Sequence, residues 1–111
     1  GAAMGNGYAV ISPSQNSISK TLALAHKYRC DDLLRTIKVT NSGSREDLLI
    51  AAREAKEEFG VDVIVLGCAN YANADGYIER ELGIPVLDGG ACALILASGL
   101  VQYNRCKKEN L

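Results

Sequence analysis

Short apolar segments of strand length alternate along the chain with longer segments whose apolar residues recur at helical spacing. The strand-like segments are bounded by turn residues or proline, and they are 7–12, 34–40, 62–67 and 84–89. The segment 62–67, with the sequence DVIVLG, is apolar on both faces, which predicts a central strand. Pro85 removes a backbone donor, so the segment 84–89 is predicted to be short and near an edge of the sheet.

A helix is predicted after each of these strands. Ser14 is expected to cap the first helix. The residues expected on the buried face of that helix are Ile18, Leu22, Leu24 and Ala25. The third helix is predicted over 73–82, with Gly83 closing it. The fourth is predicted to begin at about Gly90 and to run apolar to about Val101.

The second predicted helix carries clear signals at both ends. Ser44 and Asp47 resemble a capping arrangement at its start, and Gly60 is expected to end it. The apolar residues that would line its buried face are Leu48, Ala51, Ala52, Ala55 and Phe59. The charged residues that would point outward are Glu54, Lys56, Glu57 and Glu58.

Alternation of strand and helix, repeated along the whole chain, predicts a parallel sheet with helices on both faces. The expected fold is a three-layer α/β/α lobe with a four-stranded parallel sheet, and residues 1–111 would form this single domain. The last helix is unusually apolar for the outer layer of so small a domain, and an apolar outer face normally meets a partner. We therefore expect the chain to be one half of a larger object.

Composition and charge narrow the function classes. The 111 residues are 48% hydrophobic and 23% charged, as in an ordinary soluble globular protein. The net charge is -1, and the only basic cluster, RCKK at 105–108, is expected to be a solvated C-terminal turn, so no nucleic-acid partner is expected. The longest apolar run, 91–101, is too short to span a membrane, and the N-terminal GAAM lacks the features of a signal peptide.

Four cysteines and a single histidine argue against both disulfides and a metal site. Cys30, Cys68, Cys92 and Cys106 form no CxxC pair, and His26 is expected to be a partly exposed structural residue. Reduced thiols without paired spacing are typical of the cytoplasm, where we expect this protein to act.

Ligands of open α/β sheets bind beyond the carboxyl ends of the strands. The residues at these positions are Ser12-Pro13, Asn41-Ser42, Gly67-Cys68-Ala69-Asn70 and Asp88-Gly89-Gly90. Small residues with free backbone N–H groups at the starts of helices could hold a small anion there. Cys68 lies in the tightest of these turns, where the positive end of the helix dipole would lower the pKa of its thiol. The thiolate could then act as a nucleophile or as a proton-abstracting base.

Each cysteine also has a simpler interpretation, because cysteine is often a buried packing residue. Packing is strongly favoured for Cys92, which lies in the apolar segment GGACALILA. Cys30 and Cys106 are expected at or near the surface, without a role. The position of Cys68 favours chemistry over packing. Since no histidine is near it in the sequence, its thiol would act alone or with a second thiol.

The segment 63–101, VIVLGCANYANADGYIERELGIPVLDGGACALILASGLV, resembles the C-terminal part of the Asp/Glu/hydantoin racemase superfamily, closest to the hydantoin and allantoin racemases. The resemblance is specific where LGCA and GIPVLDG occur at the family's separation. GYAVISP at 7–13 resembles the strand that opens the second lobe, and the likeness is loose between 14 and 60. The resemblance implies two similar α/β lobes, an active site between them, no cofactor and one catalytic cysteine from each lobe.

The resemblance also implies roles for individual residues. Cys68 would be the second-lobe acid/base that exchanges a proton with the stereogenic carbon, while a thiol of the first lobe serves the opposite face. The backbone N–H groups of Cys68 and Ala69, beside Gly67, would hold a carboxylate or ring-carbonyl oxygen as negative charge develops. Ser12 would contact the substrate through its hydroxyl. Asn70 would either add a donor to the pocket or cap the next helix.

Two departures from the family pattern leave the substrate open among hydantoins, allantoin and amino acids. Pro13 stands where relatives often have a second hydroxyl residue. Asn70 and Tyr71 stand where hydantoin-type members usually have a glycine and a Met-like residue. Because relatives assemble as dimers or larger, a homo-oligomer with a small-molecule substrate is expected.

None of the other cysteines follows a strand on the active edge, so the second catalytic thiol is expected from a first lobe outside residues 1–111. The chain alone is then expected to be inactive. One alternative is a cis-trans isomerase or decarboxylase of the same superfamily that uses one cysteine. The other is a non-catalytic α/β binding module. A receiver-like module is disfavoured because the first strand ends in ISPSQN without an acidic cluster.

Overall fold

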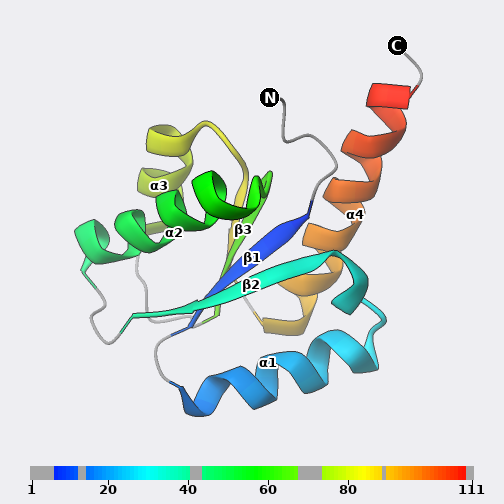
Figure 1. The fold of residues 1–111 in the computed structure, drawn as a ribbon, viewed down its shortest axis with the longest axis horizontal. Coiled ribbons are helices and arrows are strands. Elements are labelled where there is room, and N and C mark those ends of the chain that lie inside the picture. Colours follow the sequence, from blue (N-terminus) through cyan, green and yellow to red (C-terminus); the bar gives the residue numbers. More distant parts are fainter. Residues whose placement is uncertain (1–6, 13–14, 41–43, 68–73, 89, 110–111) are drawn as a thin grey trace.

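The computed structural model describes residues 7–12, 15–40, 44–67, 74–88 and 90–109. It contains one parallel sheet of four strands in the order β2-β1-β3-β4. The strands are β1 (Tyr8–Ser12), β2 (Leu34–Val39), β3 (Val63–Leu66) and β4 (Val86–Asp88). The register places Val10 of β1 beside Ile37 of β2 and Val65 of β3. β3 also pairs with β4, so β1 and β3 are the central strands (Figure 1).

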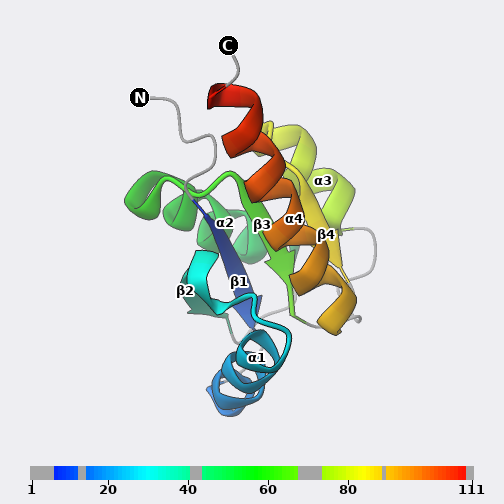
Figure 2. The ribbon, with the colours of Figure 1, turned by 90° about the vertical axis from the view of Figure 1, so that its right-hand side faces the viewer.

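Helices cover both faces of this sheet. They are α1 (Asn16–Lys27), α2 (Arg45–Phe59), α3 (Ala74–Leu82) and α4 (Gly90–Glu109), with a short 3-10 turn, η1 (Asp31–Leu33), before β2. α2 and α3 lie on one face, and α1 and α4 lie on the other (Figures 1 and 2). The predicted three-layer α/β/α fold with a four-stranded parallel sheet is therefore confirmed.

The sidedness of the sheet follows from the alternation of side chains along its strands. Ala9 and Ile11 of β1, with Ile64 and Leu66 of β3, point toward α2 and α3. Tyr8 and Val10, with Val63 and Val65, point toward α1 and α4. Helices bury both faces of the sheet, so every side chain of β3 is apolar. This continuous apolar run is the pattern from which a central strand was predicted. The predicted short edge strand is confirmed as β4, although it spans only Val86–Asp88 of the predicted segment 84–89.

The ends of α2 are those that the sequence predicts. The Ser44 hydroxyl accepts a hydrogen bond from the backbone N–H of Asp47 at 3.2 Å. Gly60 closes the helix with φ 64°, and Gly83 follows α3 with φ 70°. Both angles lie in the left-handed region that favours glycine. Lys56 was predicted to point outward, but it is half-buried because its ammonium donates to the carbonyl of Leu82 at 2.7 Å.

Two of the predicted buried faces are wrong in part. Leu22 is 48% exposed, and the half-buried Thr21 takes its place on the inward face of α1. Leu24 and Ala25 lie on that face as predicted. Phe59 is 39% exposed at the last position of α2, where its ring lies 6.0 Å from the ammonium of Lys38. α1 begins at Asn16 with Gln15 at the N-cap, which makes no side-chain capping bond, and Ser14 lies outside the described residues.

The last helix is longer than predicted. It continues past Val101 to Glu109, so the cluster RCKK lies within the helix and not in a separate turn. No glycine or proline occurs in 102–109 to stop it. A tertiary bond also holds this part of α4: the side-chain amide of Asn104 donates to Oδ2 of buried Asp62 at 2.6 Å. Asp62 itself precedes β3 and accepts from the backbone N–H of Gly7 at 3.3 Å.

The outer surface of α4 is partly apolar, as expected. Its inward residues Ala93, Leu94, Ala97 and Val101 are buried in the core of this chain. Ile95, Leu96 and Tyr103 are 46%, 58% and 62% exposed, respectively. Within the described part of the chain, no helix is long and apolar enough to cross a membrane.

Candidate functional site

The carboxyl ends of the parallel strands meet at one edge of the sheet. Ser12 ends β1 and is fully buried, and its carbonyl accepts from the backbone N–H of Thr40 at 2.9 Å. Gly67 follows β3 and donates its N–H to the carbonyl of Ile11 at 2.8 Å, so the β1–β3 ladder continues beyond Leu66. Two of the predicted site residues, Ser12 and Gly67, are thus brought together on the two central strands.

Gly67 occupies a position where the backbones approach closely. A Cβ built there would lie 3.0 Å from the carbonyl oxygen of Ile11 and 3.4 Å from Cγ1 of Val10. The first of these contacts is with main chain, which cannot move aside as the end of a flexible side chain can. A glycine at the end of β3 therefore lets the chain pass close to β1 just before it reaches Cys68.

Four predicted site residues lie outside the described residues: Pro13, Cys68, Ala69 and Asn70. Their predicted roles stay predictions, as does the substrate contact of Ser12. Cys92 lies in the first turns of α4, but its side chain is also outside what the structure describes.

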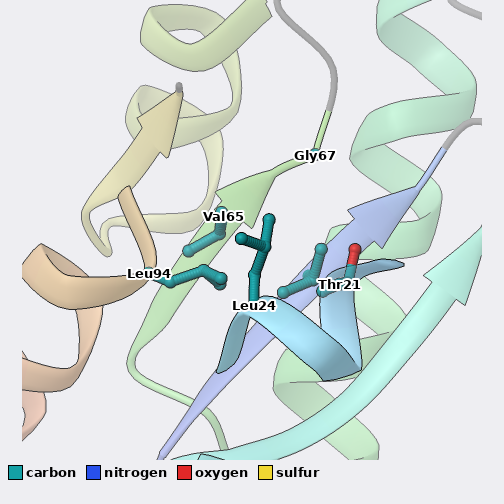
Figure 3. A pocket seen from close by; sticks show the side chains of 6 residues that line it. Thr21, Leu24, Val65, Gly67 and Leu94 are labelled. Atoms are coloured by element: carbon teal, nitrogen blue, oxygen red, sulfur yellow. The ribbon is translucent and has the colours of Figure 1, made fainter. Parts of the chain in front are cut away.

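A small pocket opens beside Gly67 on the face of the sheet covered by α1 and α4 (Figure 3). Its volume is about 50 Å³. The residues that line it are Val10, Thr21, Leu24, Val65, Gly67 and Leu94. Leu24 from α1 and Leu94 from α4 reach into it beside Val65 of the sheet. Of these lining residues, the sequence predicted only Gly67 as part of a site. Thr21 was a possible sign of the pocket, because it is a polar residue on the helix face that also carries Leu24 and Ala25.

The prediction that Cys30 lies at or near the surface is wrong. It is only 4% exposed, because the tight turn after α1 folds it against the start of β1. There the hydroxyl of Tyr8 donates to the carbonyl of Cys30 at 2.6 Å, and the thiol of Cys30 donates to the carbonyl of Tyr28 at 3.3 Å. Burial, helped by the charge of Asp31, raises the pKa of this thiol, which keeps it protonated and unreactive at neutral pH.

The remaining described thiol and the histidine also lie away from the site. Cys106 is exposed near the end of α4, as predicted. Its neighbour Asn104 contacts Asp62 at the amino end of β3, so this part of α4 lies at the edge opposite Gly67. His26 has an 86% exposed side chain and contacts Asp31 at 3.3 Å. Among the described residues, no three His, Cys, Asp or Glu side chains are grouped so that they could hold a metal ion.

Comparisons with known proteins agree with this architecture. Residues 11–97 match the family model described as Asp/Glu/Hydantoin racemase. The hydantoin racemase of Paenarthrobacter aurescens is 37% identical over 78 residues, which cover 61% of this chain and 33% of that protein.

Two solved structures share the fold. The allantoin racemase from Klebsiella pneumoniae superposes with a TM-score of 0.70 at 24% identity, covering 92% of this chain and 48% of that one. The allantoin racemase from Pseudomonas fluorescens superposes with a TM-score of 0.65 at 26% identity, covering 92% and 50%. The chain thus spans about half the length of these two structures and a third of the hydantoin racemase. With most of its length matched by the family model, the chain belongs to the Asp/Glu/hydantoin racemase family.

Proposed function

We propose that this chain is the second lobe of a cofactor-independent racemase that inverts the stereocentre of a 5-substituted hydantoin or allantoin. The observation that carries the proposal is the position of Cys68. It directly follows Gly67, at the carboxyl end of a central strand, in a chain of the racemase family. This is the edge at which α/β sheets bind ligands.

The reaction requires one proton-transfer group on each face of a carbon acid. In the proposed step, the thiolate of one cysteine takes the proton from the stereogenic carbon, and the electron pair left behind is delocalised onto the neighbouring ring carbonyl. The thiol of the other cysteine then delivers its proton to the opposite face of the carbon. The enzyme ends with its two thiols in the reverse protonation states, ready for the opposite enantiomer.

We assign Cys68 to one of these faces. The N–H groups of Cys68 and Ala69 would stabilise the negative charge that develops on the carbonyl oxygen. Ser12, Pro13 and Asn70 would contact the substrate. The pocket lined by Gly67, the residue that precedes Cys68 in the sequence, supports this proposal.

A first lobe would supply the second thiol. The described cysteines cannot serve, since Cys30 is buried and protonated and Cys106 lies toward the opposite edge of the sheet. The half-length match to the allantoin racemases supports this part of the proposal. We further propose that the exposed apolar residues of α4, Ile95, Leu96 and Tyr103, pack against that lobe, that the whole protein is a homo-oligomer, and that it acts in the cytoplasm.

Optical rotation against time tests the proposed function. The protein from the complete reading frame is incubated with single enantiomers of 5-substituted hydantoins and of allantoin. We expect the rotation of at least one substrate to decay to zero, and we expect Cys68→Ala to abolish the decay. Cys92→Ala is the matched control, because Cys92 is expected only to pack, and it should retain activity. A Cys68→Ala protein that racemises as fast as the unaltered protein would overturn the assignment. The isolated 111-residue chain should be inactive.

A further inference from the structure

A second hollow lies toward the amino ends of the strands, between the turn that follows α1 and the second half of α4. The turn lines it with Arg29, Asp32 and Leu33, and α4 lines it with Gln102, Arg105 and Cys106. None of these residues lines the pocket beside Gly67. We propose that this hollow binds a small organic carboxylate that also carries a hydroxyl or amino group. The proposal does not depend on the proposed racemase function.

The first argument is the backbone of Arg29. At the end of α1, the backbone N–H of Cys30 donates to the carbonyl of Ala25 at 2.7 Å, and that of Arg29 donates to the carbonyl of His26 at 3.1 Å. This is the Schellman arrangement, in which the residue at the left-handed position is usually glycine. Arg29 occupies that position with φ 57°. The helix end would therefore favour glycine, and the local fold does not explain an arginine there.

The second argument is charge. Arg29 and Arg105 bring two guanidinium groups to one hollow from two different elements, while Asp32 brings one carboxylate, so the formal charge of the lining is positive. Guanidinium groups bind carboxylates through paired N–H donors. Asp32 accepts hydrogen bonds, so it favours a ligand that adds an O–H or N–H donor to its own carboxylate.

The third argument is the apolar part of the lining. Leu33 is 7% exposed and belongs to the core on this side of the sheet. A ligand with a carbon skeleton would cover the remaining apolar surface of this side chain, which inorganic phosphate would not do. Gln102 adds an amide to the polar part of the lining. The lining therefore matches an organic acid better than an inorganic anion.

Cys106 provides a reporter inside the hollow, because it is exposed and belongs to the lining. Iodoacetate and iodoacetamide alkylate the same thiolate by displacing iodide, but only iodoacetate is charged. The ratio of the two rates is therefore independent of how much of the thiol is ionised. Two unit charges about 7 Å apart in water attract each other enough to change a rate about threefold. The arginines should raise the rate ratio accordingly.

The experiment measures both rates at Cys106 by peptide mass spectrometry at low ionic strength, with the protein from the complete reading frame. Arg29→Gly and Arg105→Gln should each lower the ratio of the iodoacetate rate to the iodoacetamide rate by about twofold or more. Arg29→Gly should fold, because glycine is the residue that this helix end favours. Arg53→Gln is the matched control, since it removes the charge of an exposed arginine on α2, across the sheet, and it should leave the ratio unchanged.

Protection from alkylation tests the ligand class. Lactate and alanine should slow the reaction of Cys106 with iodoacetamide at least twofold, at concentrations at which acetate, glycerol and inorganic phosphate protect less. Sodium chloride at the same ionic strength is the control for screening. Arg29→Gly should remove the protection.

An unchanged rate ratio in both Arg29→Gly and Arg105→Gln would overturn the proposal. The same conclusion would follow if lactate and alanine protected no better than sodium chloride. Protection by inorganic phosphate at lower concentration than by any carboxylate would overturn the assignment of an organic acid. None of these results would bear on racemisation, which the optical-rotation assay measures separately.

Discussion

The bond between Asn104 and Asp62 fixes the second half of α4 to the sheet, and its removal should measurably destabilise the protein. The amide of Asn104 donates to Oδ2 of Asp62 at 2.6 Å, and Asp62 is only 5% exposed. A hydrogen bond to a charged group contributes about 1.5–3 kcal/mol to stability. Alanine is a better helix former than asparagine by roughly 0.6 kcal/mol, which offsets part of the loss. Asn104→Ala should therefore lower the free energy of unfolding by about 1–2.5 kcal/mol.

Urea denaturation of the chain, followed by far-ultraviolet circular dichroism, measures this change. With a slope of about 1–3 kcal/mol per molar urea, a loss of 2 kcal/mol moves the midpoint by roughly 1 M. Gln102→Ala is the matched control on the same helix, since its amide reaches only Ser98, one turn away, at 3.2 Å. That control should stay within about 0.5 kcal/mol of the unaltered chain.

A double-mutant cycle tests whether the effect comes from this bond. Asp62→Ala and Asn104→Ala should be non-additive, with a coupling free energy of about 1 kcal/mol or more. If Asn104→Ala destabilises no more than Gln102→Ala, or if the coupling is zero, the bond does not hold α4 to the sheet. The helix would then extend to Glu109 through its own propensity alone.

Three further predictions concern backbone and titration. Gly83 and Gly99 both have open space where a Cβ would be, but only Gly83 has a positive φ, of 70°. Gly99→Ala within α4 should therefore stabilise by about 0.5–1 kcal/mol and Gly83→Ala should destabilise, and equal effects in thermal melts would contradict this. Gly67→Ala should lower kcat/KM for hydantoins more than tenfold while the chain still folds, because its Cβ would press on the β1 carbonyl at 3.0 Å; unchanged kinetics would refute that reasoning. Burial raises the pKa of Tyr8 and Cys30, so the folded state holds both protons more tightly than the unfolded state. Stability should be full below about pH 9 and fall above it, by at most about 1.4 kcal/mol per pH unit for each group, and a urea midpoint constant from pH 8 to 10.5 would contradict this.

Much of the fold could be predicted from local signals. The run Val63–Leu66 is apolar on both faces, as expected of a central strand. At the start of α2 the side chain of Ser44 accepts a hydrogen bond from a backbone N–H, and at its end Gly60 adopts the left-handed conformation that closes a helix. These signals operate within a few residues, so one sequence is enough to read them.

The wrong predictions concern burial and helix length at places where residues distant in the sequence make the deciding contacts. Cys30 is buried because the turn after α1 folds it against the start of β1, where the hydroxyl of Tyr8, 22 residues earlier, donates to its carbonyl. α4 extends past Val101 where Asn104 meets Asp62, 42 residues earlier. The buried stripe of α1 includes Thr21 because the helix packs beside α4 and the sheet, and hydrophobicity alone favoured Leu22.

The candidate site also has one part that local sequence signals predict and one part that depends on the tertiary fold. LGCA and the position after a strand were enough to select Gly67 and Cys68, because strand ends and family motifs are local features. The pocket could not be predicted, since its walls come from β1, α1, β3 and α4, four elements that only the tertiary fold brings together.

The central claim is that Cys68 is one of two thiols that transfer protons on opposite faces of the substrate. Proton NMR in D₂O tests it most directly, with the protein from the complete reading frame and a single enantiomer of 5-methylhydantoin. The account predicts that, early in the reaction, the inverted product carries deuterium at the stereogenic carbon while the remaining substrate keeps its hydrogen, and that Cys68→Ala forms no inverted product. Early deuterium in the remaining substrate, or inversion by Cys68→Ala at the rate of the unaltered protein, would contradict it.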